Sequence, residues 1–150
     1  MKVVRLLVSV VFVASFAAGC SGSSPAPTSP SSAGSSPDLT VSPFPGTWNL
    51  MSIQPAGEAE LARPSGASYT ITFADGRLST RADCNSCDGT YTLTGQTLVA
   101  GPSLACTRAA CATMPFENAY TRLLAGESTV SLAGGTLVLA SPRGVLRFTR

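Results

Sequence analysis

Apolar and polar residues alternate along most of the chain after residue 45. In residues 69–74, Tyr69, Ile71 and Phe73 alternate with smaller or more polar residues, a pattern typical of a strand with one buried face. The same period recurs up to residue 148 and predicts about eight short strands. The other expected inward positions are Trp48, Leu50 and Ile53; Leu78, Thr80 and Ala82; Tyr91 and Leu93; Leu98 and Ala100; Val130 and Leu132; Leu137 and Leu139; Leu146 and Phe148.

Short turn sequences separate these strands, and glycine or aspartate in them supplies the backbone conformations that tight hairpins need. Strands joined by hairpins pair as an antiparallel meander. A strongly twisted meander curls towards a barrel, because closure removes its exposed edges. The turns are Ala74-Asp75-Gly76, Thr94-Gly95-Gln96, Gly134-Gly135 and Pro142-Arg143-Gly144.

One segment, residues 114–125, has apolar residues at helical spacing instead. Thr113 can cap its start, and Gly126 follows its end. A helix this short is not stable alone, so we expect its apolar stripe to pack against the sheet. The fold class is therefore mainly β: a small antiparallel meander curled into a barrel-like sheet, with one packed amphipathic helix. The apolar stripe consists of Phe116, Ala119, Tyr120, Leu123 and Leu124.

The first residues have the order of an export signal: Lys2 and Arg5 are basic, an apolar run follows, and small residues lead to Cys20. The run is too short to span a bilayer comfortably. The ending Ala17-Ala18-Gly19-Cys20 resembles a bacterial lipobox, which implies that residues 1–19 are a lipoprotein signal peptide and that Cys20 receives a lipid anchor. The alternative is an ordinary secreted protein in which Cys20 keeps a free thiol.

Residues 20–45 are rich in serine and proline and predict a disordered tether, because they cannot bury enough apolar surface to fold. The folded domain is expected over residues 46–150, with a modest core. Ser21 stands where diderm lipoproteins of the inner membrane often carry aspartate, so we expect an outer-membrane anchor facing the periplasm. Contact with the membrane is expected through the lipid, and the domain is expected to be a monomer.

Charge and composition narrow the function further. Histidine is absent, which removes imidazole as a catalytic base or metal ligand. Removing residues 1–19 takes away Lys2 and Arg5 and leaves eight basic and eight acidic residues, so the mature net charge is zero. A neutral domain has no field that attracts nucleic acid. We expect no nucleic-acid partner and no cofactor.

Four domain cysteines allow three interpretations. In an exported protein an even set of cysteines is normally oxidised, which predicts two disulfides. A four-thiolate zinc site would need reduced sulfurs, which an oxidising compartment opposes. A dithiol redox motif would need its first cysteine at a helix N-terminus, whereas this pair is expected between a strand that ends near Ala82 and one that starts near Gly89. The cysteines are Cys84, Cys87, Cys106 and Cys111.

Several motifs together resemble the META (HslJ-like) domain, over residues 46–150. The resemblance implies a small, mainly β domain, common in lipoproteins and secreted proteins linked to envelope stress, drug tolerance or virulence, with no established enzymatic activity. The motifs are Trp48-Asn49-Leu50, Arg81-Ala82-Asp83-Cys84-Asn85, Gly89-Thr90-Tyr91, Thr107-Arg108-Ala109-Ala110-Cys111 and Phe116-Glu117.

The chain departs from the family pattern in two ways. Asp83 replaces the usual glycine before the first cysteine, and Cys87 and Cys106 are additional. Because Cys84 and Cys111 occupy the two family cysteine positions, the resemblance implies disulfides Cys84–Cys111 and Cys87–Cys106. The sequence alone permits three pairings.

Arg81, Asn85 and Arg108 are the candidate site residues. Asn85 is expected to be structural, because asparagine caps turns and tolerates left-handed backbone. Two guanidinium groups near one loop could instead hold an anion or a partner's carboxylate. The simpler alternative is an ion pair of Arg108 at the rim, which would contribute little to stability. The candidate partners of Arg108 are Asp83, Asp88 and Glu117.

The leading hypothesis is a non-catalytic envelope lipoprotein whose disulfide-bonded domain binds a periplasmic or surface protein, with a stress-related or inhibitor-like role. The alternatives are a four-cysteine zinc or dithiol redox domain, and a carboxylate enzyme that works without histidine. Such an enzyme needs two acids on facing walls of a cleft. Of the acids in the domain, only Asp83, Asp88 and Glu117 are expected to converge.

Overall fold

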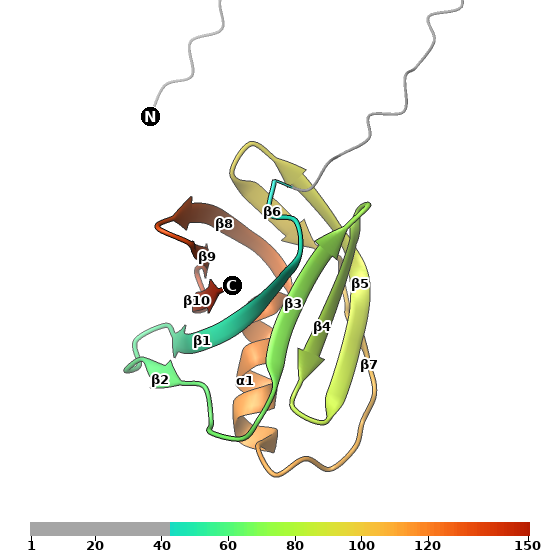
Figure 1. Cartoon of the computed structure of the whole chain (residues 1–150), viewed down its shortest axis with the longest axis vertical. Helices are drawn as coiled ribbons and strands as arrows, with labels where there is room; N and C mark the ends of the chain where they lie inside the picture. The colour runs from blue at the N-terminus through green and yellow to red at the C-terminus, as the bar shows by residue number, and fades with distance from the viewer. Residues whose placement is uncertain (1–42) are drawn as a thin grey trace, which may run out of the picture. The chain divides into compact units, whose positions relative to one another are not determined.

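The computed structural model describes residues 43–150, in which eight antiparallel strands close into a barrel with a single helix (Figure 1). The predicted signal peptide, Cys20 and nearly all of the tether lie outside these residues. The elements are β1 (Thr47–Pro55), β2 (Leu61–Ala62), β3 (Tyr69–Ala74), β4 (Arg77–Ala82), β5 (Asn85–Thr94), β6 (Thr97–Ala100), β7 (Ala105–Cys106), α1 (Met114–Leu124), β8 (Gly126–Ala133), β9 (Thr136–Ser141) and β10 (Gly144–Thr149).

The barrel follows the meander predicted from the alternation. Its strands pair in the order β10-β9-β8-β6-β5-β4-β3-β1, and β1 also pairs with β10. The two-residue strands β2 and β7 attach to β1 and β5. In β4 the side chains of Leu78, Thr80 and Ala82 are buried and the intervening residues are exposed, as a strand with one inward face requires. The predicted fold class is confirmed.

The seam between β1 and β10 closes the barrel. It pairs Asn49 with Thr149 at one end and Pro55 with Gly144 at the other, with an irregularity in register between Leu50 and Ser52. Gly144 has a φ of 142°, which side chains other than glycine rarely permit. A Cβ atom there would collide with the carbonyl oxygen of Gln54, so the seam needs glycine at this corner.

The β4–β5 hairpin differs from the prediction. Strand β5 begins at Asn85 rather than near Gly89. Cys84 therefore lies in a two-residue turn, and Cys87 lies in the strand that follows it. Asp83 in this turn has a φ of 56°. Glycine, which the resemblance leads one to expect at this position, adopts left-handed backbone freely, and aspartate is among the other residues that tolerate it.

The interior of the barrel is filled by large side chains. Tyr69, Phe73, Tyr120 and Phe148 are each at most 2% exposed. The rings of Tyr69 and Tyr120 meet edge to face with centroids 5.3 Å apart, a favoured geometry for aromatic pairs. Phe44 also packs against Phe73, at 5.4 Å, so the packed structure includes residues just before the expected boundary at residue 46.

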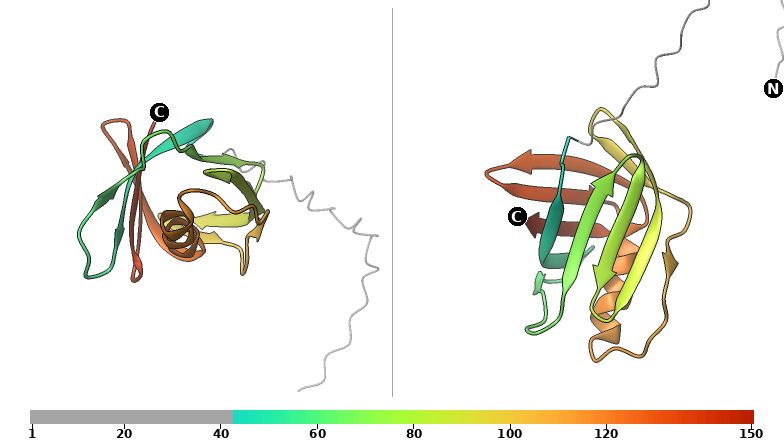
Figure 2. Two further views of the ribbon diagram at one scale, coloured as in Figure 1. Left: turned by 90° about the horizontal axis from the view of Figure 1, so that it is seen from below. Right: turned by 45° about the vertical axis from the view of Figure 1, so that its right-hand side comes forward.

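Helix α1 lies against the barrel with strands on both sides of it (Figure 2, left). Tyr120, Leu123 and Leu124 are buried as predicted. Phe116 and Ala119 belong to the same stripe but remain half-buried, because the barrel does not cover the whole apolar face. Leu132 was expected inside, but it is 48% exposed, since it lies at the end of β8 beside the Gly134-Gly135 turn.

Candidate functional site

The four domain cysteines form two nested disulfides beside the start of α1. Cys84 pairs with Cys111, with Cα atoms 5.7 Å apart, and Cys87 pairs with Cys106, with Cα atoms 4.0 Å apart. This is the pairing that the family resemblance implied. The inner bond joins β5 to β7, where the two cysteines face each other in register. No sulfur of the domain is left as a thiolate that could bind zinc or cycle as a dithiol.

Asn85 holds the segment between the disulfides and the helix. Its side chain is 1% exposed, and Nδ2 donates to the carbonyl oxygen of Ala109 at 3.0 Å and to Oε1 of Glu117 at 2.8 Å. The same nitrogen lies 3.1 Å from Sγ of Cys111. Oδ1 accepts from Oγ1 of Thr107 at 2.9 Å and from the backbone N–H of Ala109 at 2.8 Å.

Asn85 is thus structural, but not through its own backbone conformation. The left-handed residue of the turn is Asp83, and Asn85 acts through its side chain from the first position of β5. Glu117 is 6% exposed, and its Oε2 has no hydrogen-bond partner among the described residues. The amide of Asn85 is therefore the side-chain donor that compensates the burial of this carboxyl group.

Two hydroxyl chains link the core to this region. Thr113 donates to Oδ2 of Asp83 at 2.6 Å, so the hydroxyl of Tyr69 donates to Thr113 at 2.7 Å. Burial raises the pKa of Tyr69, and the carboxylates of Asp83 and Glu117 raise it further, against the opposing effect of the Thr113 hydrogen bond. These bonds fix the N-terminal end of α1 to the β3–β5 side of the barrel.

The second chain runs through Tyr120. Thr80 donates to the carbonyl oxygen of Thr70 at 2.6 Å, so the hydroxyl of Tyr120 donates to Thr80, also at 2.6 Å. Burial is the main cause that raises the pKa of Tyr120 well above its ordinary value. The folded domain therefore keeps this phenol protonated at pH values where an unfolded chain ionises it.

We expect stability to fall as the pH rises above 10. The unfolded chain then releases the Tyr120 proton and the folded chain keeps it, so ionisation favours unfolding. Between pH 9 and pH 11, the free energy of unfolding of the Tyr120→Phe variant should fall by about 1.4 kcal/mol less than that of the wild type. Urea unfolding at both pH values measures this difference. Equal losses in the two proteins would show that Tyr120 contributes nothing to the alkaline transition.

The predicted anion site is not assembled by any contact in the described part of the chain. Arg81 donates from Nε to the carbonyl oxygen of Asp83 at 3.0 Å. Arg108 is exposed and makes no hydrogen bond or ion pair within residues 43–150. Within residues 43–150 the ion pair present joins Arg147 to Glu60 at 3.4 Å. This pairing was not predicted from the sequence.

The acids that were expected to converge have separate partners. Asp83 accepts from Thr113 and Glu117 accepts from Asn85. Asp88 accepts from Ser79 Oγ at 2.6 Å on the exposed side of the β4–β5 pair. Asp83 and Glu117 both act on Tyr69, but neither residue lines the main pockets of the described residues.

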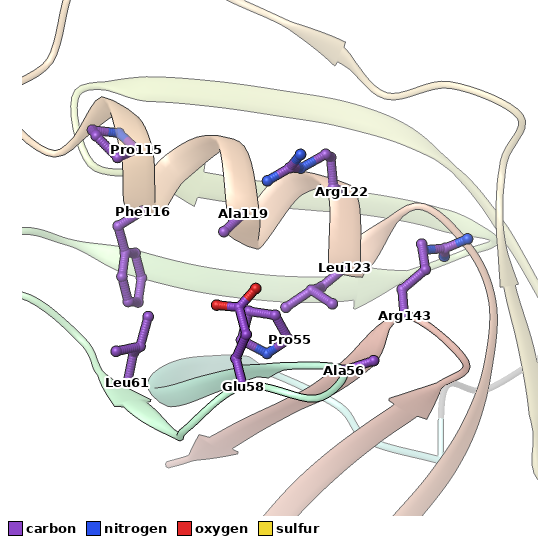
Figure 3. Close-up of a pocket in the computed structure, with 10 residues that line it drawn as sticks. All are labelled: Pro55, Ala56, Glu58, Leu61, Pro115, Phe116, Ala119, Arg122, Leu123 and Arg143. Atoms are coloured by element: carbon purple, nitrogen blue, oxygen red, sulfur yellow. The ribbon is translucent and has the colours of Figure 1, made fainter.

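A pocket of about 660 Å³ lies instead on the outside of the barrel, between α1 and the segment that follows β1 (Figure 3). We call it the α1 pocket. Its volume is within the range of ligand-binding sites. One wall is the side of α1 that the barrel leaves uncovered, and the other wall comes from residues 55–61. It is lined by Pro55, Ala56, Glu58, Leu61, Pro115, Phe116, Ala119, Arg122, Leu123 and Arg143.

The lining changes in character along the helix. Phe116 and Leu61 face each other near the start of α1, and the carboxylate of Glu58 points towards the helix at its middle (Figure 3). Arg122 and Arg143 lie near the end of α1, where Arg143 donates to the carbonyl oxygen of Ala125. One indication of this pocket is already present in the sequence: the apolar stripe on α1 extends to Phe116 and Ala119.

Two further properties concern residues 43–150. No helix in this range is long and apolar enough to cross a bilayer. No group of three or more aspartate, glutamate, histidine or cysteine residues in it is placed to hold a metal ion.

Comparisons with known proteins agree with the fold. The family model described as "META domain" matches residues 39–150. An NMR structure of a protein from Burkholderia xenovorans is 26% identical, with a TM-score of 0.58, over 83% of this chain and 98% of that one. Another NMR structure is 24% identical, with a TM-score of 0.54, over 69% of this chain and 86% of that one. Among curated proteins none is significantly similar. The chain belongs to the META domain family.

Proposed function

We propose that this chain is a non-catalytic, lipid-anchored domain of the bacterial cell envelope that binds a protein partner. The observation that carries the proposal is the filled barrel. Aromatic and aliphatic side chains occupy its interior, as in the packed cores of small barrels, so a ligand has to bind on the outer surface. The α1 pocket offers such a depression on the described surface.

The disulfides support the cell envelope as the compartment. Two disulfides in so small a domain are typical of exported proteins, because cytosolic thiols are kept reduced. The sequence adds the signal-like residues 1–19 and the lipobox-like cysteine at position 20. We propose that the anchor is in the outer membrane and faces the periplasm, and that the domain acts as a monomer by shielding or inhibiting its partner.

The acids of the domain support a non-catalytic role. A pair of catalytic carboxylates needs a shared cleft. Asp83 and Glu117 are both engaged by side-chain donors beside α1, and the carboxylate that faces the α1 pocket, Glu58, has no second acid among the residues lining it.

Expression of the full chain in a diderm bacterium tests this proposal. We expect the mature protein in the outer-membrane fraction, with processing blocked by globomycin and an N-terminal peptide whose mass includes acyl chains on Cys20. The matched Cys20→Ser variant should appear in a soluble exported fraction. Alkylation under denaturing, metal-free conditions should label none of the four domain cysteines.

Two results would reject the proposal. One is an unprocessed chain that stays in the cytoplasm. The other is a set of four domain cysteines that react with the alkylating agent without prior reduction. If the Cys20→Ser variant stayed in the membrane, only the proposed lipidation of Cys20 would be rejected.

A further inference from the structure

We propose that the α1 pocket binds a short peptide segment of a partner protein in which an apolar side chain lies within a few residues of a carboxylate. This inference rests on the proposed binding function and names the chemistry of the partner. It follows from three properties of the pocket: the apolar end, the pair of arginines at the opposite end, and the single acid between them.

The apolar end is formed by side chains that the fold leaves uncovered. Leu61 is 45% exposed on the short strand β2, and Phe116 and Ala119 are half-buried on α1. Phe116 and Leu61 face each other across the pocket (Figure 3). An apolar side chain placed between them would bury their surface together with its own, and such burial is the main source of favourable free energy in peptide recognition.

The arginine end carries donors that the protein itself does not use. Arg122 donates from Nε to the carbonyl oxygen of Asn118 at 3.1 Å, and Arg143 donates from Nη2 to that of Ala125. Neither arginine forms an ion pair in the described part of the chain. Their remaining N–H groups can bind a carboxylate, for which guanidinium groups have matching geometry.

The bonds to the helix also hold these arginines in place. Gly126, at a φ of 82°, follows α1, and a Cβ atom there would lie 3.2 Å from Nη2 of Arg143. The absence of a side chain at Gly126 leaves room for the guanidinium group against the backbone. A charge that is already positioned loses less conformational entropy when a partner binds.

Glu58 distinguishes a peptide from a lipid. Its carboxylate points into the pocket (Figure 3) and forms no ion pair within residues 43–150. A peptide can donate backbone N–H groups to this carboxylate. An acyl chain has no donor and would desolvate the acid without compensation. With two cations and one anion, the pocket also favours an occupant with net negative charge.

Selection from a random heptapeptide library tests the inference. The target is the exported Cys20→Ser chain with its disulfides intact, and peptides that also bind the pocket-filling variant Ala119→Trp are discarded. We expect the selected sequences to share an apolar residue within three positions of aspartate, glutamate or the C-terminal carboxylate. Fluorescence anisotropy of labelled peptides then gives Kd for each variant.

The variants separate the two halves of the site. Ala119→Trp, and the double change Arg122→Gln with Arg143→Gln, should each raise Kd by about tenfold or more. Leu61→Asp changes an exposed residue of the facing wall and should weaken binding to the same extent. This variant keeps the test decisive if Ala119→Trp does not fold. Arg77→Gln, an exposed arginine of β4, is the matched control and should leave Kd within about twofold.

Three outcomes would overturn the inference: no enriched motif, enriched peptides whose affinity is unchanged by Leu61→Asp, or enrichment of basic peptides that require Glu58. Binding of oleate vesicles in place of peptides would also overturn it, in favour of a lipid site. The selection uses purified protein, so its failure would not change the fractionation result that tests the proposed function. A failed fractionation test would likewise not change the result of the selection.

Discussion

Replacing Asn85 with alanine is expected to lower the free energy of unfolding by about 3–4 kcal/mol. The substitution removes hydrogen bonds to Thr107, Ala109 and Glu117 at once. It also leaves the buried carboxyl group of Glu117 without its side-chain donor, and an unpaired buried polar group costs more than an average hydrogen bond contributes. Urea unfolding with intact disulfides measures the change in midpoint and slope.

Asn118→Ala is the matched control for this experiment. Asn118 is an exposed asparagine on α1, and its loss should change stability by less than about 0.5 kcal/mol. A double-mutant cycle of Asn85→Ala with Glu117→Ala should give a coupling energy of about 1.5–3 kcal/mol. A loss below 1 kcal/mol for Asn85→Ala alone would contradict the role of this side chain.

Removing the outer disulfide is the second large effect. The Cys84→Ala, Cys111→Ala variant should be less stable by about 2–3 kcal/mol, because the inner bond still joins the same two segments and leaves the outer bond only a short effective loop to close in the unfolded chain. The two cysteines are separated by 27 residues in sequence. For a domain of this size the loss is a large part of a typical total of 5–15 kcal/mol. Urea unfolding of the exported protein under non-reducing conditions measures it.

The inner disulfide provides the comparison. In the Cys87→Ala, Cys106→Ala variant the outer bond still confines the same region, so the effective loop is shorter and the loss should be about 2–3 kcal/mol. Loop closure alone therefore predicts similar losses for the two variants, and a clearly larger loss in the inner variant would contradict this account. In that case the burial of Cys87, which is 1% exposed, would be the larger contribution.

Most of the barrel could be predicted because its strands have one buried face. Alternation at Tyr69, Ile71 and Phe73 is a local property of the chain and survives in the structure. The start of β5 was missed because its first residues are polar or cysteine, with no apolar alternation to indicate a strand. Leu132 was misplaced because the pattern cannot show where a strand extends beyond the core.

The site was less predictable, because its contacts connect distant parts of the chain. The motifs around Asn85 and Cys111 indicated a resemblance to a family, but not that one amide would join β5, the loop before α1 and Glu117. The α1 pocket has a wall in residues 55–61, where no period of two or of 3.6 is present. These residues form a pocket wall only because the barrel leaves Phe116 and Ala119 partly uncovered. How far the barrel covers these two side chains depends on tertiary packing.

The pairing of β1 with β10 has a consequence for biosynthesis. The barrel is completed by hydrogen bonds between residues 47–55 and residues 144–149, so the first strand has no permanent neighbour on one edge until the last strand has been made. Contacts of such sequence separation form slowly. The barrel therefore cannot close until β10 is present, and a premature stop codon before Gly144 would yield an open sheet with an aggregation-prone edge.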